Sequence, residues 1–351
     1  MDLPVVGSGA GNRTRVHALI SFLVKHSYLT VIQLGRRPLY SIDHLLPPRV
    51  NIIYLDNEHI YDKERNITSV NRMLNNDDYR VCIIEYIHMS YFLKSVPEGV
   101  TTILDSHDII SDSNASFHTF NLPSFKFNLS REQEFKIFNL YDYVMLIAKQ
   151  DYLKLGPELG FDRLILAPHP AQIKDRPLRP KVRRVGFIAS EYTPNVDAIK
   201  WFLENVWQSF SLGVELELNI YGHVCSALSS NYISKFRSVK LNGFLEDLDS
   251  AYEEIDIAIN PVRFGAGLKI KNVEALANGI PLITTSHGAG GLEGAESTFF
   301  VANSPIEFFD TIQLLVNNFQ LRMEIVNSSK KWLRENFSED RCFAGIGKLL
   351  K

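Results

Sequence analysis

The chain has 351 residues, of which 45% are hydrophobic and 22% are charged, and its formal net charge is −3. This length exceeds one typical core of about 100–150 residues and suits two domains. The composition is ordinary for a globular protein and excludes a disordered or fibrous one. Neither half carries the basic excess of a nucleic-acid-binding protein, so we expect no nucleic-acid partner.

The three cysteines, Cys82, Cys225 and Cys342, are far apart and form no C-x-x-C pair. This spacing fits a reducing compartment and predicts neither a disulfide framework nor a structural zinc site. No apolar run approaches the ~18 residues of a membrane span. We therefore expect a cytoplasmic protein.

Short β-branched runs alternate with helical patterns in the first half, which predicts a parallel sheet with helices on both faces. The expected strands are 3–6, 28–34, 50–55, 80–86, 101–104 and 144–147. The expected helices are 17–25, 67–74 and 130–140. Ser130 and Gln133 fit a capping box at the start of the last of these helices.

Prolines and scattered charges in residues 169–180 cannot continue a strand or a helix, so we expect a linker there. The expected strands after it are 184–188, 216–221, 239–241, 255–260 and 281–284. The expected helices are 196–207, 248–254, 271–278 and those from 304 to about 334. The predicted organisation is a Rossmann-like domain at 1–168, a linker at 169–180, a second Rossmann-like domain at 181–330 and a helical tail at 331–351. We expect the tail to pack back toward the N-terminal domain and the two domains to enclose a central cleft.

The most informative run is NPVRFGAGLKIKNVEALANGIPLITTSHGAGG, residues 260–291. Gly265 and Gly267 let a ligand approach the backbone closely, and a helix begins near Lys271. The N–H groups and dipole at the start of a helix suit a diphosphate, and nearby lysines add positive charge. Glu274 could accept two ribose hydroxyls. The alternative is a tight turn into an ordinary helix with solvated lysines, but a second glycine loop at 288–291 favours a ligand site.

The run RFGAGLKIKNVEALANGIPLITT, with GFLEDL before it and GAGGL after it, resembles the nucleotide-sugar domain of GT-B glycosyltransferases. It is most similar to group 1, the retaining bacterial sugar transferases. The resemblance extends upstream to Gly186 and to the TPNVDA run. It is looser in the first half, where Gly9 and Gly11 precede an arginine-bearing helix and DSHD follows a strand at 105–108.

The resemblance implies that Glu274 binds the donor ribose, that residues 265–269 contact the diphosphate and sugar, and that the backbone at 243–245 contacts the base. The expected donor-binding residues are Gly9, Gly11, Arg15, Asn195, Gly243, Phe244, Leu245, Arg263, Gly265, Ala266, Gly267, Leu268, Lys271 and Glu274. The expected catalytic residues are His107, Asp108 and Lys269. One departure concerns the sugar contacts: many members of the family have a glutamate where this chain has Ala266.

Several of these residues have a structural alternative. His107 and Asp108, with Asp105 on the acceptor side, could orient an acceptor hydroxyl or could cap the following helix or turn. Arg15 and Arg263 could meet phosphate or solvent, and Asn195 could cap its helix instead of touching a ligand.

Two further motifs also have two interpretations. The D-x-D motif at 247–249 has a metal-binding form, but helix capping explains it better, so we expect no metal. The aromatic run 116–128 could meet a lipid-linked acceptor at a membrane surface or could pack into the core.

The resemblance implies a glycosyltransferase that moves a sugar from a nucleoside-diphosphate donor to a saccharide or lipid-linked acceptor, with retention, and needs neither a cofactor nor a metal. The implied setting is bacterial surface polysaccharide or lipopolysaccharide synthesis, in the cytoplasm or at the inner face of the plasma membrane. One alternative is a catalytically silent GT-B subunit that binds a partner enzyme. The other is an NADP-dependent oxidoreductase, suggested by the glycines at 7–11 with Arg36 and Arg37.

Overall fold

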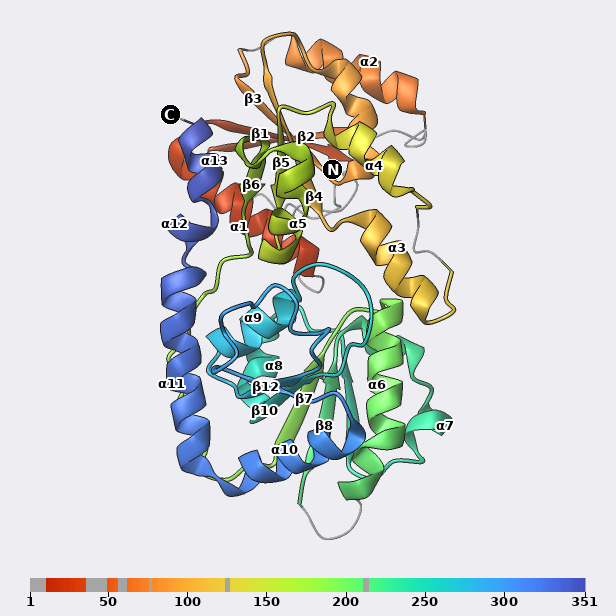
Figure 1. The fold of residues 1–351 in the computed structure, drawn as a ribbon, viewed down its shortest axis with the longest axis vertical. Helices are drawn as coiled ribbons and strands as arrows, with labels where there is room; N and C mark the ends of the chain where they lie inside the picture. Colours follow the sequence, from red (N-terminus) through yellow and green to blue (C-terminus); the bar gives the residue numbers. More distant parts are fainter. Residues whose placement is uncertain are drawn as a thin grey trace. The chain divides into compact units, whose positions relative to one another are not determined.

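The computed structural model describes residues 11–35, 49–55, 62–75, 78–123, 127–210 and 215–350, which form two compact units (Figure 1). One unit contains Asn12–Pro168 and the chain from Cys342 onward, and the other contains His169–Arg341. Every strand pairing in both units is parallel, as the alternating pattern predicts. The expected strand at 3–6 lies outside the described residues.

The first unit consists of short strands separated by helices. Its helices are α1 (Gly11–His26), α2 (Lys63–Leu74), α3 (Ile110–Thr119), α4 (Arg131–Phe138), α5 (Lys149–Leu159) and α13 (Ala344–Leu349), with 3₁₀ helices η2 (Ile87–Ser95) and η3 (Phe161–Arg163). Its strands are β1 (Leu29–Leu34), β2 (Val50–Leu55), β3 (Val81–Glu85), β4 (Thr101–His107), β5 (Tyr143–Leu146) and β6 (Leu164–Leu166). The capping box of Ser130 and Gln133 at the start of α4 is confirmed.

The strands of the first unit form a two-stranded sheet, β1-β2, and a four-stranded sheet, β3-β4-β5-β6. The core of the larger sheet contains Leu104, Phe138 and Leu146, none of which is exposed. The end of the chain belongs to this unit, because Phe343 packs against Phe22 with ring centroids 5.1 Å apart. These buried aliphatic and aromatic contacts hold the carboxyl end of β4 in place.

The second unit has the strand order of a Rossmann fold, β12-β11-β10-β7-β8-β9. Its strands are β7 (Arg184–Ile188), β8 (Glu217–Tyr221), β9 (Val239–Gly243), β10 (Ile257–Asn260), β11 (Leu282–Thr284) and β12 (Phe300–Val301). Its helices are α6 (Thr193–Asn205), α7 (Ser230–Ile233), α8 (Leu248–Glu254), α9 (Ile270–Ala277), α10 (Pro305–Asn317) and α11 (Phe319–Asn336), with 3₁₀ helices η4 (Trp207–Phe210) and η5 (His223–Ala227); α12 (Glu339–Cys342) follows. In its core, Phe202 of α6 meets Phe308 of α10 edge to face, with centroids 5.7 Å apart.

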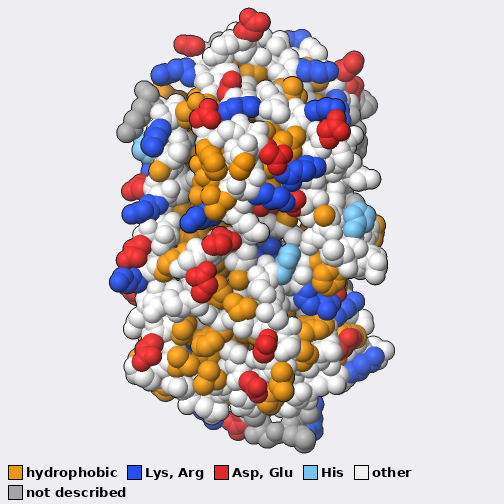
Figure 2. Space-filling model, in the orientation of Figure 1, with side chains coloured by type: hydrophobic (Ala, Val, Ile, Leu, Met, Phe, Trp, Pro, Cys, Tyr) orange, Lys and Arg blue, Asp and Glu red, His pale blue; other side chains and the backbone are white. Residues whose placement is uncertain are grey.

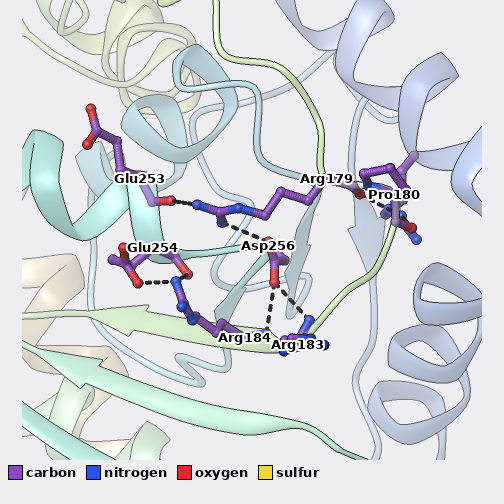
Figure 3. Close-up of polar contacts among 8 residues, drawn as sticks. Arg179, Pro180, Arg183, Arg184, Glu253, Glu254 and Asp256 are labelled. Carbon is purple, nitrogen blue, oxygen red and sulfur yellow. Dashed lines mark hydrogen bonds and ion pairs between the residues drawn. The ribbon is translucent and has the colours of Figure 1, made fainter.

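Residues 169–180 form no helix or strand, as their prolines predict, and they are bound to the second unit. Arg179 Nη1 donates to Asp256 Oδ1 at 2.9 Å, and the other oxygen of Asp256 accepts from the backbone N–H groups of Arg183 and Arg184 (Figure 3). The buried Arg322 donates to the carbonyls of Arg179 and Pro180 at 3.1 and 2.7 Å. These bonds fix the start of β7 relative to the chain that precedes it.

The surface shown in Figure 2 mixes both signs of charge, with Lys and Arg side chains scattered among Asp and Glu. This face has no continuous basic surface among the described residues. Within the same residues, no helix combines the length and the apolar character that crossing a membrane requires.

Candidate nucleotide-sugar site

The order of the strands in the second unit reverses between β7 and β10, which are neighbours at the centre of the sheet. Ligands of doubly wound folds bind at such a switch point, at the carboxyl ends of the strands. The chain leaving β7 enters α6, and the chain leaving β10 forms the glycine loop at 265–267. The two segments touch, because Arg263 pairs with both carboxylate oxygens of Asp197 at 2.8 Å.

The glycine loop has a backbone conformation that only glycine adopts readily. Gly265 has φ +114° and Gly267 has φ +70°, both in the left-handed region. Lys269, the residue before α9, folds back and donates its Nζ to the carbonyls of Ala266 and Gly267 at 2.8 and 2.9 Å. The ammonium group therefore holds the loop against the start of α9, where it adds positive charge to the helix dipole.

The second glycine loop packs against Leu268, the residue that follows the first loop. A Cβ on Gly291 would lie 2.6 Å from Leu268 Cδ1, so a side chain there would displace the first loop. Asn272 of α9 donates to the carbonyl of Gly288 at 2.8 Å. Both loops thus contact one helix, α9, whose first two turns carry Lys271 and Glu274.

Glu274 lies in α9 as a half-buried residue, and its carboxylate accepts a hydrogen bond of 2.9 Å from Tyr252 Oη. Burial raises the pKa of Glu274 to about 7, although the Tyr252 hydrogen bond lowers it. The same burial and the neighbouring carboxylate raise the pKa of Tyr252 well above its usual value, so the phenol stays a donor. A carboxylate held this way is suited to accept a pair of vicinal hydroxyls.

Lys271 is not a solvated lysine. Its Nζ donates to Asn195 Oδ1 at 2.6 Å and lies 4.8 Å from the centre of the Phe187 ring. Burial and the nearby Lys269 charge lower the pKa of Lys271 to about 7. An anion at the glycine loop would favour the charged form of this amine.

Asn195 does not cap α6, so that alternative was wrong. The residue that precedes the helix is Tyr192, which makes no side-chain capping bond. Asn195 lies inside the first turn, where it bonds the carbonyl of Ser190 at 3.1 Å and holds Lys271. The capping interpretation of the D-x-D motif is confirmed, because Asp247 accepts from the N–H of Asp249 at 2.9 Å.

The region expected to meet the base follows β9. Gly243 has φ +72°, and the side chain of Phe244 is 41% exposed. The Phe244 ring stacks on the imidazole of His223, with centroids 4.6 Å apart and planes 20° from parallel. This pair offers an exposed aromatic face next to the backbone at 243–245.

The first unit contains a buried group of charged side chains around His107. His107 Nε2 lies 2.9 Å from Glu85 Oε2 and 3.7 Å from Asp105 Oδ2. Arg15 is completely enclosed and donates to both oxygens of Asp105 at 3.1 and 3.0 Å and to the carbonyl of Ala167. We expected Arg15 to meet either phosphate or solvent, and both expectations were wrong. Arg15 is enclosed and paired with Asp105 in this structure.

Asp108 and its neighbours do not cap α3 with their side chains. The residue before α3 is Ile109, and the first N–H groups of the helix, those of Ile110 and Ser111, bond to the carboxylate of Glu134 at 2.6 and 2.9 Å. The turn alternative holds in part, since Ser106 Oγ donates to the carbonyl of Asp108. Asp108 is half-buried.

Several expected residues lie outside what the structure describes. Gly9, Arg36 and Arg37 are among them, and only the backbone of Gly11, the first residue of α1, is described. In the aromatic run, Phe117 is 2% exposed and belongs to the core, as the second interpretation predicted, whereas Phe127 is 37% exposed.

Sequence reasoning missed the side chains that hold the expected residues in place. These are Glu85 for His107, Tyr252 for Glu274, and Asp197 for Arg263. Glu85 left a signal, because it is a polar residue at the end of an apolar strand and pairs in register with Asp105. Tyr252 and Asp197 are far from their partners in the sequence and left none.

One group of described side chains, Glu85, Asp105 and His107, brings possible metal-ligating atoms within 4.8 Å of one another. The Arg15 guanidinium already neutralises Asp105 through both of its oxygens. A second cation would have to displace or oppose this buried charge. The donor set therefore fits an internal ion-pair network better than a metal.

Comparison with known proteins identifies similar sequences and structures. Residues 182–318 match the family model of glycosyl transferases group 1. A Klebsiella pneumoniae protein described as an uncharacterized 44.6 kDa protein in the cps region is 24% identical over 293 residues, which cover 77% of this chain and 74% of that protein.

Solved structures share the fold at low identity. A glycosyltransferase from Rickettsia africae has a TM-score of 0.72 and 11% identity, covering 99% of this chain and 96% of its own. Anabaena Alr3699/HepE in complex with UDP and glucose has a TM-score of 0.71 and 12% identity, with coverages of 98% and 97%.

S. aureus TarM, in complex with Fondaparinux, alpha-GlcNAc-glycerol and UDP, has a TM-score of 0.66 and 14% identity. The match covers 82% of this chain, which spans only 59% of TarM. Residues 182–318 therefore match the glycosyl transferases group 1 family, and the chain that carries them has the fold of GT-B glycosyltransferases.

Proposed function

We propose that the chain transfers a sugar from a nucleoside-diphosphate donor to a saccharide or lipid-linked saccharide acceptor, with retention at the anomeric carbon. The observation that carries the proposal is the set of groups gathered at the start of α9. A glycine loop closed by Lys269 leads into this helix, and the carboxylate of Glu274 follows in its second turn, at the switch point of a Rossmann sheet.

The nucleotide part of the donor fits this geometry group by group. The diphosphate would meet the N–H groups of the glycine loop and the start of α9, with Lys269 and Lys271 supplying positive charge. The ribose would bind the Glu274 carboxylate, and the base would meet the backbone at 243–245 with Phe244 and His223 beside it. Asn195 and Arg263 act by holding Lys271 and the loop.

The reaction needs no metal in this proposal. As the bond from the sugar to the diphosphate breaks, negative charge grows on the leaving phosphate, and the lysines and helix N–H groups stabilise that charge. His107 and Asp108, at the carboxyl end of β4 in the first unit, are proposed to orient reacting hydroxyls. A cytoplasmic enzyme of surface-polysaccharide synthesis is consistent with the Klebsiella relative, which is described as a protein in the cps region.

A thermal-shift screen tests the nucleotide site. The purified chain is heated with UDP, GDP, dTDP, CMP and NADP⁺, alongside the variants Glu274→Gln and Glu335→Gln. Ligand at 100 times its Kd stabilises a protein by roughly 2.7 kcal/mol, which a melting curve resolves. We expect one nucleoside diphosphate to raise the melting temperature of the wild type and of Glu335→Gln, whose side chain is exposed on α11, but much less that of Glu274→Gln.

The same screen separates the alternatives. A response to NADP⁺ alone would refute the proposal in favour of an oxidoreductase. A nucleoside diphosphate that binds without any turnover of its sugar conjugates, in the presence of varied acceptors, would support a silent GT-B subunit instead.

A further inference from the structure

The imidazole of His107 is held by a carboxylate from the neighbouring strand. Glu85 is the last residue of β3 and pairs in register with Asp105 of β4, so both carboxylates reach the carboxyl end of the same sheet. The register of β4 and β5 shifts between Asp105 and His107, next to the contact of the imidazole with Glu85. His107 Nε2 and Glu85 Oε2 are 2.9 Å apart.

Two non-glycine residues next to this bond have backbone conformations in the left-handed region. His107 has φ +61° and Tyr86, which follows Glu85, has φ +68°. Non-glycine residues in this region cost about 1–3 kcal/mol each and cluster at functional sites. The Tyr86 ring stacks on the His107 ring, with centroids 4.3 Å apart and planes 18° from parallel.

Four ionisable groups form one buried chain. Arg15 and Asp105 are completely enclosed, His107 is 5% exposed and Glu85 is 7% exposed. The chain runs from Arg15 of α1 through Asp105 to His107 and ends at Glu85. Such a network contributes little net stability, because the desolvation of each charge offsets the attraction. Its presence therefore calls for a functional explanation.

The surroundings of His107 favour the charged imidazole. Burial by itself lowers the pKa of His107, but the Asp105 charge and the hydrogen bond that Glu85 accepts outweigh it and raise the pKa above its usual value. Arg15 opposes this effect only in part. The other neighbours are the ring of Tyr86 and, stacked behind it, that of His88.

We propose that Glu85 is a positioning residue for His107, which it orients and holds in the protonated, cationic form. A cationic imidazole donates from both nitrogens. Because Glu85 takes Nε2, the Nδ1–H is left as the donor for the reacting hydroxyl that His107 is proposed to orient. The expected effect on kcat rests on the proposed sugar transfer, whereas the charge state of His107 does not.

The test compares Glu85→Gln with Glu134→Gln. Glu134 is a buried glutamate of the same unit whose carboxylate holds the start of α3, so its variant controls for the loss of a buried carboxylate. The His107 resonance is assigned by its absence from the spectrum of His107→Gln, and its titration is followed by NMR. Amide spectra establish that each variant is folded.

In Glu85→Gln we expect the midpoint of the His107 titration to fall by about one pH unit or more. We expect kcat to fall at least tenfold at pH 7.5. The alkaline limb of the pH profile should move to lower pH by the same number of pH units as the His107 midpoint. Glu134→Gln should change neither quantity. An unchanged His107 midpoint in folded Glu85→Gln would overturn the proposal.

Two further results keep the test decisive. Should Glu85→Gln fail to fold, Glu85→Asp keeps the charge but shortens the reach, and we expect it to keep a raised His107 midpoint while kcat falls. A lowered midpoint in the wild type would overturn the proposal whatever the activity. If no nucleotide sugar is turned over but the midpoint shifts as expected, the sugar-transfer proposal fails and the role of Glu85 in holding the charge stands.

Discussion

Replacing Glu274 with glutamine should stabilise the second unit at neutral pH while removing its ribose-binding carboxylate. Burial raises the pKa of Glu274 from its ordinary 4.5 to about 7. The folded chain therefore keeps a proton between those pH values that the unfolded chain has lost. The free energy of unfolding must fall as the pH rises through this window.

The size of the effect follows from the pKa. Each pH unit of difference is worth about 1.4 kcal/mol, so the wild type loses about 2 to 3 kcal/mol between pH 5 and pH 8 through this group. Glutamine has no charge to lose, and its amide oxygen can still accept from Tyr252. The stability of Glu274→Gln relative to the wild type should therefore rise by about 2 to 3 kcal/mol over that range.

Urea unfolding followed by tryptophan fluorescence measures this directly. The three tryptophans, Trp201, Trp207 and Trp332, all belong to the second unit, so the signal reports that unit alone. Glu335→Gln makes the same change of charge on the exposed face of α11 and should follow the wild type at both pH values. Equal midpoints for Glu274→Gln and the wild type at pH 8 as well as pH 5 would refute the reasoning.

Three other substitutions test separate contacts. Tyr252→Phe removes the hydrogen bond that lowers the pKa of Glu274, so nucleotide affinity should fall about tenfold at pH 7 and recover toward pH 9 in calorimetric titrations; a pH-independent loss would contradict this. Gly265→Ala places a residue with a side chain at φ +114°, which should lower the free energy of unfolding by about 1–3 kcal/mol in urea and weaken nucleotide binding. Unchanged binding would contradict the assignment of the nucleotide to the glycine loop. Arg322→Leu leaves the carbonyls of Arg179 and Pro180 without their donor, so the second unit should lose about 3 kcal/mol and trypsin should cut residues 169–180 faster; an unchanged cleavage rate would show that other bonds hold the segment.

Most strands were predictable because buried parallel strands are continuous apolar runs, whereas the short β6 and β12 were not predicted. The expected ranges 184–188 and 50–55 coincide with β7 and β2, and the helix at 248–254 coincides with α8. The helices α3 and α5 were not predicted. The sequence of α3 is polar, and its first turn is held by Glu134 from α4, while α5 has no side-chain cap and contains Pro157.

The candidate site was predictable where its residues lie close together in the sequence. Residues 265–274 carry the loop, the lysines and the carboxylate in one run. The glycines of this run adopt the positive φ angles that their residue type allows. The side chains that form hydrogen bonds with these groups come from distant parts of the sequence. The phenol of Tyr252 lies 22 residues from Glu274, and Asn195 lies 76 residues from Lys271, so only the folded sheet brings them together.

Hydrogen–deuterium exchange with and without the nucleoside diphosphate selected by the thermal screen tests the central claim most directly, because it locates the bound nucleotide on the chain. We predict that the nucleotide protects the peptides covering residues 243–245 and 261–279 in the wild type and in Glu335→Gln, with much weaker protection in Glu274→Gln. Protection of these peptides that is equally strong in Glu274→Gln, or protection confined to other segments, would contradict the assignment of the donor site to α9 and its glycine loop.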